Sequence, residues 1–308
     1  MATRTDTCIE IADNPTWTLL NKMSRCGEKS CPVQKYTPKY PLPNLPHNEA
    51  YIFGPSPVIP VVPTRIRKRK VMVLGMYPTA RYLVAEQITP NSGLSGDVND
   101  REVPIRDINE PFEETRYFNG YCISHVRAGT TMQQEYFSPL GLRLPDLWIT
   151  NTVKCFLFKE SHVEKFKKIH QSVGQSLNDE YPGFRQTRYP FADAAKVCMA
   201  KWLVEEIRLC DPKLIIALGE EICRLIHGDE NFEPTGDALL FNKLIDNSPL
   251  LRQGAPSPNG QRRHAAFFDR NILFLNHPSR IAQDDNDLER HRRLVEDLRN
   301  EVQQLVQL

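Results

Sequence analysis

The sequence predicts an α/β protein built on a parallel sheet with helices on both faces. Two observations predict it: unbroken apolar runs of strand length recur along the chain, and some segments between them show the three- and four-residue spacing of amphipathic helices. A strand that is apolar at every position is buried on both sides, and helical crossovers join parallel strands. We therefore expect a three-layer α/β/α sandwich with a central four-stranded parallel sheet.

Four apolar runs are the expected strands: residues 71–75, 147–150, 213–219 and 272–275. The clearest amphipathic helix covers residues 192–210, where apolar side chains recur at helical spacing and Asp211-Pro212 ends the pattern. Two more helices are expected, over residues 220–226 and from about Asp285 to Leu308.

The N-terminal region and two internal segments depart from this pattern. Nine of the 24 prolines lie between Pro32 and Pro63, so residues 1–64 are expected to form an irregular extension without helices or central strands. Residues 65–308 form the domain itself. Within it, residues 87–116 suggest a long functional loop with a short strand near 103–106, and the basic, aromatic segment 156–190 suggests an insertion.

Composition and charge exclude several classes of protein. With 40% hydrophobic and 25% charged residues, the chain has the composition of a globular protein. A net charge of +1 excludes nucleic-acid binding by bulk charge, although the basic run 65–70 allows a local DNA-binding surface. No apolar run approaches the roughly 18 residues of a membrane span, and the first ten residues are polar. We expect a cytoplasmic monomer with no membrane partner.

The sheet topology directs attention to particular residues. In open parallel sheets, ligands bind at the carboxyl ends of the strands. Here those ends carry residues 75–78, Asn151, Gly219 and His277. A binding or catalytic site is therefore expected where these residues meet.

Six short blocks resemble one family when they are taken in order. They are residues 73–78, 111–112, 148–155, 198–203, 212–219 and 277–279. Together they resemble the uracil-DNA glycosylase superfamily over about residues 70–280, most closely its iron–sulfur-containing bacterial and archaeal families. The resemblance implies a DNA glycosylase that flips uracil or another deaminated or modified base out of DNA and hydrolyses its N-glycosidic bond, leaving an abasic site.

That reaction defines three roles for side chains. A flipped base needs an aromatic platform, an amide that reads its edge, and a donor to the base oxygen on which negative charge grows. The resemblance assigns these roles to Phe112, Asn151 and His277, with Tyr117 and Phe118 as alternative platforms. The structural alternatives are a histidine bonded to backbone at a strand end, an asparagine capping a turn, and a phenylalanine in the core of its own loop.

The first block departs from the family. Related enzymes often carry an acid or amide there that orients the attacking water, whereas this chain follows Gly75 with Met76 and Tyr77. The resemblance implies that these three residues line the substrate site, with Tyr77 at the catalytic position. A bulky Tyr77 could favour a different base, and the lost polar group leaves a noncatalytic DNA-binding protein as a further alternative.

Contacts with DNA are expected beside the last block. Ser279 and Arg280 follow His277 in a loop that approaches the DNA backbone in the family. Further basic candidates are the run 65–70 and six residues of the insertion: Lys159, Lys165, Lys167, Lys168, Arg185 and Arg188.

Four of the eight cysteines stand in the order of the family's cluster ligands: Cys26, Cys31, Cys155 and Cys198. The resemblance therefore implies a 4Fe-4S cluster, which four thiolates hold. The gap between Cys26 and Cys31 is longer than usual, as is the gap between Cys155 and Cys198, which the insertion would lengthen. The alternatives are a four-cysteine zinc site and four buried free thiols. Cys210 and Cys223 are expected to face the core.

Overall fold

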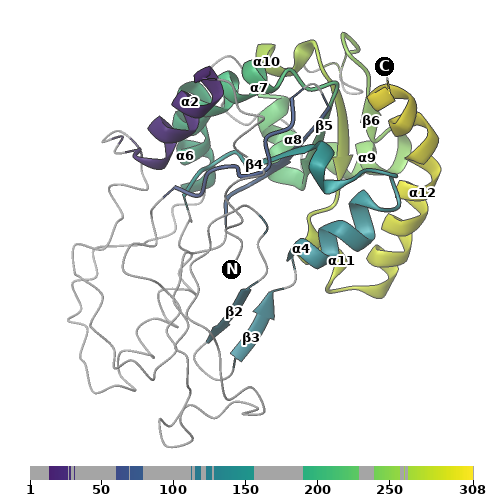
Figure 1. Ribbon diagram of the computed structural model, residues 1–308. Coiled ribbons are helices and arrows are strands. Elements are labelled where there is room, and N and C mark those ends of the chain that lie inside the picture. The colour runs from purple at the N-terminus through teal and green to yellow at the C-terminus, as the bar shows by residue number, and fades with distance from the viewer. Residues whose placement is uncertain are drawn as a thin grey trace, which may run out of the picture.

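The computed structural model describes residues 14–26, 28, 31, 60–68, 70–78, 112, 115–118, 123–126, 128–155, 190–228, 239–256, 260 and 263–307. At its centre is a five-stranded sheet with the strand order β4-β1-β5-β7-β6 (Figure 1). The strands are β1 (Val71–Gly75), β4 (Leu147–Asn151), β5 (Leu214–Leu218), β6 (Leu250–Leu251) and β7 (Asn271–Leu275). A separate antiparallel pair is formed by β2 (Thr115–Phe118) and β3 (Ile123–Val126).

The four expected strands pair in parallel, which confirms the predicted α/β class. The predicted strand number was wrong, because β6 adds a fifth, antiparallel strand beside β7. β6 has two residues, which is too short to show an alternation of apolar and polar side chains.

Helices lie on both faces of this sheet (Figure 1). On one face are α2 (Asn14–Ser24), α6 (Pro190–Cys198), η3 (Met199–Leu203), α7 (Val204–Cys210), α8 (Glu220–Ile226) and α9 (Leu239–Asn247). On the other are η1 (Met132–Phe137), α11 (Pro278–Ile281) and α12 (Asp285–Gln307). Three short elements complete the described part: α4 (Ala128–Thr131), η2 (Leu144–Asp146) and α10 (Ala265–Phe268).

Each strand contributes to two cores because its side chains alternate between the faces. Met72 and Leu74 of β1 are fully buried on the side of α6 and α7. Val71 and Val73 are fully buried on the side of α12. Burial on both faces explains why the strands are apolar at nearly every position.

The N-terminal region contains a helix that the sequence analysis did not expect. α2 buries Leu19, Leu20 and Met23 in the core that it shares with α6 and α7. These residues lie before the proline-rich stretch, so the proline density of residues 32–63 does not apply to them. The expectation that residues 1–64 contain no helix was therefore wrong.

The expected helix over residues 192–210 is present but is not uniformly α-helical. α6 and α7 are joined by the π-helical turn η3, and Asp211 ends the helix in the left-handed conformation at φ +46°. The expected helices over 220–226 and from Asp285 are α8 and α12. The strand expected near 103–106 and nearly all of the insertion lie outside the described residues. No helix in the described part of the chain is long and apolar enough to cross a membrane.

Candidate active site at the strand ends

Gly75, Asn151 and Phe112 meet at the carboxyl end of β1. Gly75 lies opposite Asn151 in the parallel pairing of β1 with β4. A Cβ atom on Gly75 would lie 2.4 Å from Asn151 Oδ1 and 2.8 Å from Phe112 Cζ. Both distances are shorter than van der Waals contact, so this close approach requires glycine. The structure thus brings three of the predicted substrate-binding residues together.

Phe112 adopts an unusual backbone conformation. Its φ is +59°, in the left-handed region that a bulky residue seldom occupies. Such a conformation costs free energy, and it persists only where surrounding contacts hold it. Here it coincides with a phenyl ring packed against the end of β1.

His277 lies across the sheet from Asn151. It follows β7, whereas Asn151 ends β4, so the two strands are three spacings apart, or about 14 Å. The two strands between them, β1 and β5, run into Gly75 and Gly219. A Cβ atom on Gly219 would lie 3.4 Å from the Cβ of His277. Neither glycine places a side chain between Asn151 and His277.

The hydrogen bonds of His277 define its tautomer. Nδ1 accepts the backbone N–H of Ser279 at 3.2 Å and lies 2.7 Å from the Ser279 hydroxyl oxygen. A backbone N–H can only donate, so Nδ1 is an acceptor and the proton of the neutral ring lies on Nε2. His277 also forms the N-cap of α11 in this way. The predicted residue Ser279 therefore orients His277 through its backbone N–H.

The chain entering the His277 turn is held by Tyr136. The Tyr136 hydroxyl donates to the backbone carbonyl of Asn276 at 2.8 Å. Burial, together with the charge of Glu135, raises the pKa of Tyr136 well above its usual range, so the phenol remains a donor. Tyr136 belongs to the π-helical turn η1, and such turns often occur at functional sites. Sequence reasoning assigned no element to residues 132–137 and therefore did not identify Tyr136.

Met76 and Tyr77 leave the strand end toward the core that contains the cysteines. Both are half-buried and pack against the cluster of residues around α6. The Tyr77 ring lies 6.5 Å from that of Phe191, at the start of α6, with 49° between the ring planes. The backbone carbonyls of Gly75 and Met76 accept from Thr152 and Val153.

The basic candidates are divided between two ends of the sheet. Arg280 follows His277 and forms an ion pair with Asp287 of α12 at 3.1 Å. Ile66, within the run 65–70, instead bridges to Trp148 of β4. Lys70 directly precedes β1 and donates to the Val306 carbonyl. It therefore lies at the amino ends of the strands, opposite the carboxyl ends that carry Asn151 and His277. The structure therefore brings Arg280, but not Lys70, to the candidate site. The six basic candidates of the insertion lie outside the described residues.

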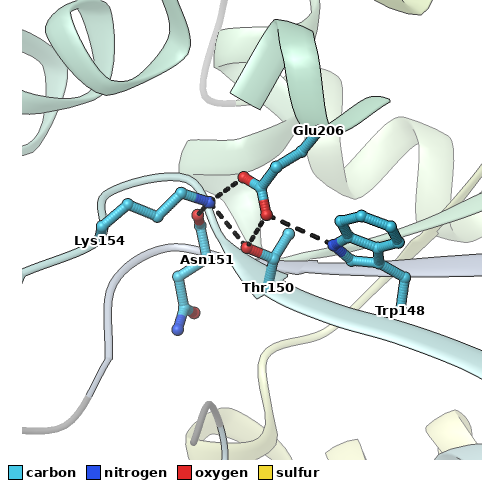
Figure 2. A network of polar contacts seen from close by, with 5 residues as sticks. All are labelled: Trp148, Thr150, Asn151, Lys154 and Glu206. Atoms are coloured by element: carbon cyan, nitrogen blue, oxygen red, sulfur yellow. Dashed lines mark hydrogen bonds and ion pairs between the residues drawn. The ribbon is translucent and has the colours of Figure 1, made fainter. Parts of the chain in front are cut away.

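A buried polar network lies behind Asn151 (Figure 2). Lys154 and Glu206 form an ion pair whose side chains are 1% and 0% exposed. Lys154 Nζ also donates to the Asn151 carbonyl and to Thr150 Oγ1, at 2.5 and 2.7 Å. Glu206 Oε1 accepts from Thr150 at 2.9 Å and from the Trp148 indole at 3.3 Å. Sequence reasoning missed this pair, although Glu206 stands on the apolar stripe of its helix, three residues after Leu203.

The four candidate cluster cysteines also come together. Cys31, Cys155 and Cys198 are buried in one core cluster, and Cys26 packs against it half-buried. Burial raises the pKa of Cys155, and the nearby thiols of Cys198, Cys31 and Cys26 raise it further. Burial also raises the pKa of Cys198 to about 12, although a hydrogen bond from the backbone N–H of Lys154 lowers it. Among the described residues, no three His, Cys, Asp or Glu side chains are grouped so as to hold one metal ion.

The other two cysteines that the sequence analysis considered, Cys210 and Cys223, are fully buried, which confirms that they face the core.

Comparison with known proteins adds a family to this geometry. The model of the family described as the uracil DNA glycosylase superfamily matches residues 109–299, which is more than half of the chain. The matched range contains Phe112, Asn151 and His277, while β1, Cys26 and Cys31 precede it. A search of curated proteins finds no match.

Proposed function

Since the chain belongs to the uracil DNA glycosylase superfamily, it is a glycosylase-type hydrolase, and we propose that it removes uracil or another modified base from DNA at the strand-end site. The observation that carries this proposal is the hydrogen bond from the Ser279 N–H to His277 Nδ1. The Ser279 N–H occupies Nδ1, so the neutral ring has its donor on Nε2, at the strand end opposite the amide of Asn151. A donor and an amide at the same end of the sheet are the groups that a flipped base needs.

His277 would act on the leaving base. Breaking the N-glycosidic bond leaves negative charge on the base, and a fixed N–H aimed at a base oxygen stabilises that charge as it grows. Because Ser279 and the short helix α11 hold the ring, little reorganisation is needed when the charge appears.

Asn151 and Phe112 would hold the flipped base. An amide offers one acceptor and two donors, which can pair with the edge of a pyrimidine. A phenyl ring beside that amide provides a surface on which the base stacks after leaving the duplex. Asn151 therefore contributes to the choice of base as well as to its orientation.

The residues after β1 bear on which base is removed. Met76 and Tyr77 provide no carboxylate to orient water, so in this proposal stabilisation of the leaving base and strain held in the sugar supply most of the barrier reduction. The Tyr77 ring packs toward Phe191 and the cysteine-containing core. A modified base other than uracil is the second candidate substrate, and the lack of a water-orienting acid or amide at Met76 and Tyr77 favours it.

The substrate is tested with a panel of oligonucleotides that each carry one modified base. We expect free base and an alkali-labile abasic site from at least one member, and a His277→Ala variant that binds the same duplex but cleaves it far more slowly. Wild-type protein that binds DNA but cleaves no member of the panel would favour the noncatalytic alternative.

We also propose that Cys26, Cys31, Cys155 and Cys198 hold a 4Fe-4S cluster. The thiols fit this group because all four lie near one another and three are buried, and burial alone disfavours the thiolates of Cys155 and Cys198. Bound iron supplies the positive charge that stabilises buried thiolates.

The cluster is tested by analysing metal in protein purified without oxygen. We expect about four irons per chain for a cluster of this type, and loss of soluble protein in Cys155→Ala, because a structural metal group contributes to folding. Stoichiometric zinc, or soluble metal-free protein with unchanged melting temperature, would contradict the cluster.

A further inference from the structure

We propose that the buried pair Lys154–Glu206 is a positioning device that fixes the direction of the Asn151 amide. This inference rests on the proposed function, since it assigns a role to residues that lie behind Asn151, the proposed base-reading residue. Lys154 and Glu206 do not belong to the set that would touch the base. They act through the backbone and neighbours of Asn151.

The hydrogen bonds of Lys154 converge on the turn that carries Asn151. Its ammonium group folds back three residues to the Asn151 carbonyl, at 2.5 Å. Figure 2 shows that this carbonyl faces Lys154 while the side-chain amide of Asn151 points away from the network. Holding the carbonyl limits rotation of the peptide after Asn151, which in turn fixes where the amide points.

The opposite side of Asn151 is held by β1. The Gly75 carbonyl accepts from Thr152 N–H at 2.8 Å, and Asn151 Oδ1 lies close against Gly75. Lys154 therefore supplies the second of two restraints on one short turn. If an uncharged residue replaces Lys154, the Asn151 carbonyl loses its charged donor at the end of β4.

Glu206 keeps Lys154 in place. One carboxylate oxygen binds the ammonium group, and the other accepts from Thr150 and Trp148, which lie in β4 itself. The pair thus ties helix α7 to the last residues of β4. Lys154 also reaches the cysteine site, because its backbone N–H donates to Cys198.

Stability alone is a weak explanation for this pair. Two charges that are 1% and 0% exposed have lost their hydration, and uncharged replacements of similar volume often leave a fold equally stable or more stable. What an uncharged replacement loses is the geometry around Asn151. A positioning role and a purely structural role therefore predict different results for a charge-free variant.

The test is the double variant Lys154→Met with Glu206→Gln. It removes both charges and the donor to Asn151, while the glutamine oxygen still accepts from Trp148 and Thr150. We expect a melting temperature close to that of the wild type and unchanged duplex affinity. Single-turnover cleavage of the preferred base should fall on the order of a hundredfold, the typical effect of a misplacement of about 1 Å, with reduced discrimination between bases.

The matched control is Glu205→Met with Arg208→Met. It removes an exposed ion pair from the same helix, next to Glu206 in sequence, and should leave rate and discrimination unchanged. Thr150→Val and Thr150→Ser form a second comparison. Valine removes the hydroxyl that links Lys154 to Glu206 and should slow cleavage, whereas serine keeps it and should preserve the rate.

The outcomes separate the two proposals. A folded double variant that cleaves and discriminates like the wild type would overturn the positioning role alone. Slow cleavage accompanied by a matching loss of duplex affinity would also overturn it, because the defect would then lie in binding. A wild type that cleaves no base would overturn the proposed function, and the positioning role with it.

Discussion

His277 and Asn151 are each restrained at two points by groups of the protein. For His277 these are the Ser279 N–H on the ring and the Tyr136 hydroxyl on the preceding carbonyl. Asn151 is restrained by its pairing with Gly75 and by the ammonium group of Lys154. Such restraints are established during folding, so the reaction itself need not supply the free energy of orientation.

Gly75→Ala tests the crowding at the end of β1. The new methyl group would collide with Asn151 Oδ1 and with the Phe112 ring, at 2.4 and 2.8 Å, so the amide and the ring must move. We expect cleavage to fall by roughly a hundredfold, as for a misplacement of about 1 Å, with a melting temperature that changes far less. Single-turnover assays and thermal melts measure the two effects.

Gly254→Ala is the control for that variant, because Gly254 has no atom within 4 Å of its added Cβ. Its φ of +70° adds backbone strain that Gly75 does not have, so a lower melting temperature in Gly254→Ala alone would not bear on the site. Full activity in Gly75→Ala would show that Asn151 and Phe112 are not needed in their present positions.

Single residues were predictable where a motif and a strand end coincide. Gly75, Asn151 and His277 follow apolar runs, and the runs fix where the strands stop. Lys154 and Glu206 were not predictable in this way. Charged residues on a helix usually face solvent, and the partner of Glu206 lies 52 residues away in sequence.

Among helices and strands, the long and fully buried ones could be located from the sequence, and the short ones could not. β1 and β7 were located to within a residue because their positions are apolar except for Asn271, whereas β6 is too short to show a pattern. The π-helical turns η1 and η3 were also unpredictable, since their departure from helical spacing lasts about one turn. Both adjoin residues that support the site, Tyr136 within η1 and Glu206 just after η3.

The ion pair between Arg280 of α11 and Asp287 of α12 predicts how DNA affinity changes when either charge is removed. Arg280 now binds Asp287, so a DNA phosphate must compete with that carboxylate. Asp287→Asn should therefore tighten duplex binding, while Arg280→Ala should weaken it for all sequences and reduce the salt slope by about one. Affinity measured across a salt series tests both changes.

Arg208→Ala is the control for these variants, because it removes an exposed, paired arginine from α7, on the other face of the sheet. Equal effects of Arg208→Ala and Arg280→Ala would mean that the site loop has no special role in binding DNA.

For the whole molecule, a net charge of +1 leaves DNA binding to local groups. It also places little electrostatic repulsion on the fold near neutral pH. The pH dependence of stability then depends on individual buried groups, of which His227 and His291 are two. Burial lowers the pKa of both histidines. Hydrogen bonds to the Cys223 carbonyl, for His227, and to the Glu135 carbonyl, for His291, raise it by less.

These two histidines predict lower stability in mild acid. Their pKa is below about 6.5 in the folded state and near that value when unfolded, so the unfolded chain takes up protons first as the pH falls. Their contribution to stability is therefore full above about pH 6.5 and is lost below it. The melting temperature should fall between pH 7.5 and 5.5.

The double variant His227→Gln with His291→Gln should reduce that fall. Glu135, whose pKa its hydrogen bond to Arg292 lowers, contributes only at more acidic pH. A wild-type melting temperature that stays constant or rises between pH 7.5 and 5.5 would contradict the assignment.

The central claim is that His277 stabilises the departing base, and one comparison tests it most directly: the single-turnover rate and the duplex affinity of His277→Ala beside those of the wild type. A contact made mainly in the transition state lowers the rate without weakening binding. We predict a rate that falls about a hundred- to a thousandfold at nearly unchanged affinity. An active wild type whose His277→Ala variant keeps the full rate would contradict the claim, and the catalytic donor would have to be another group.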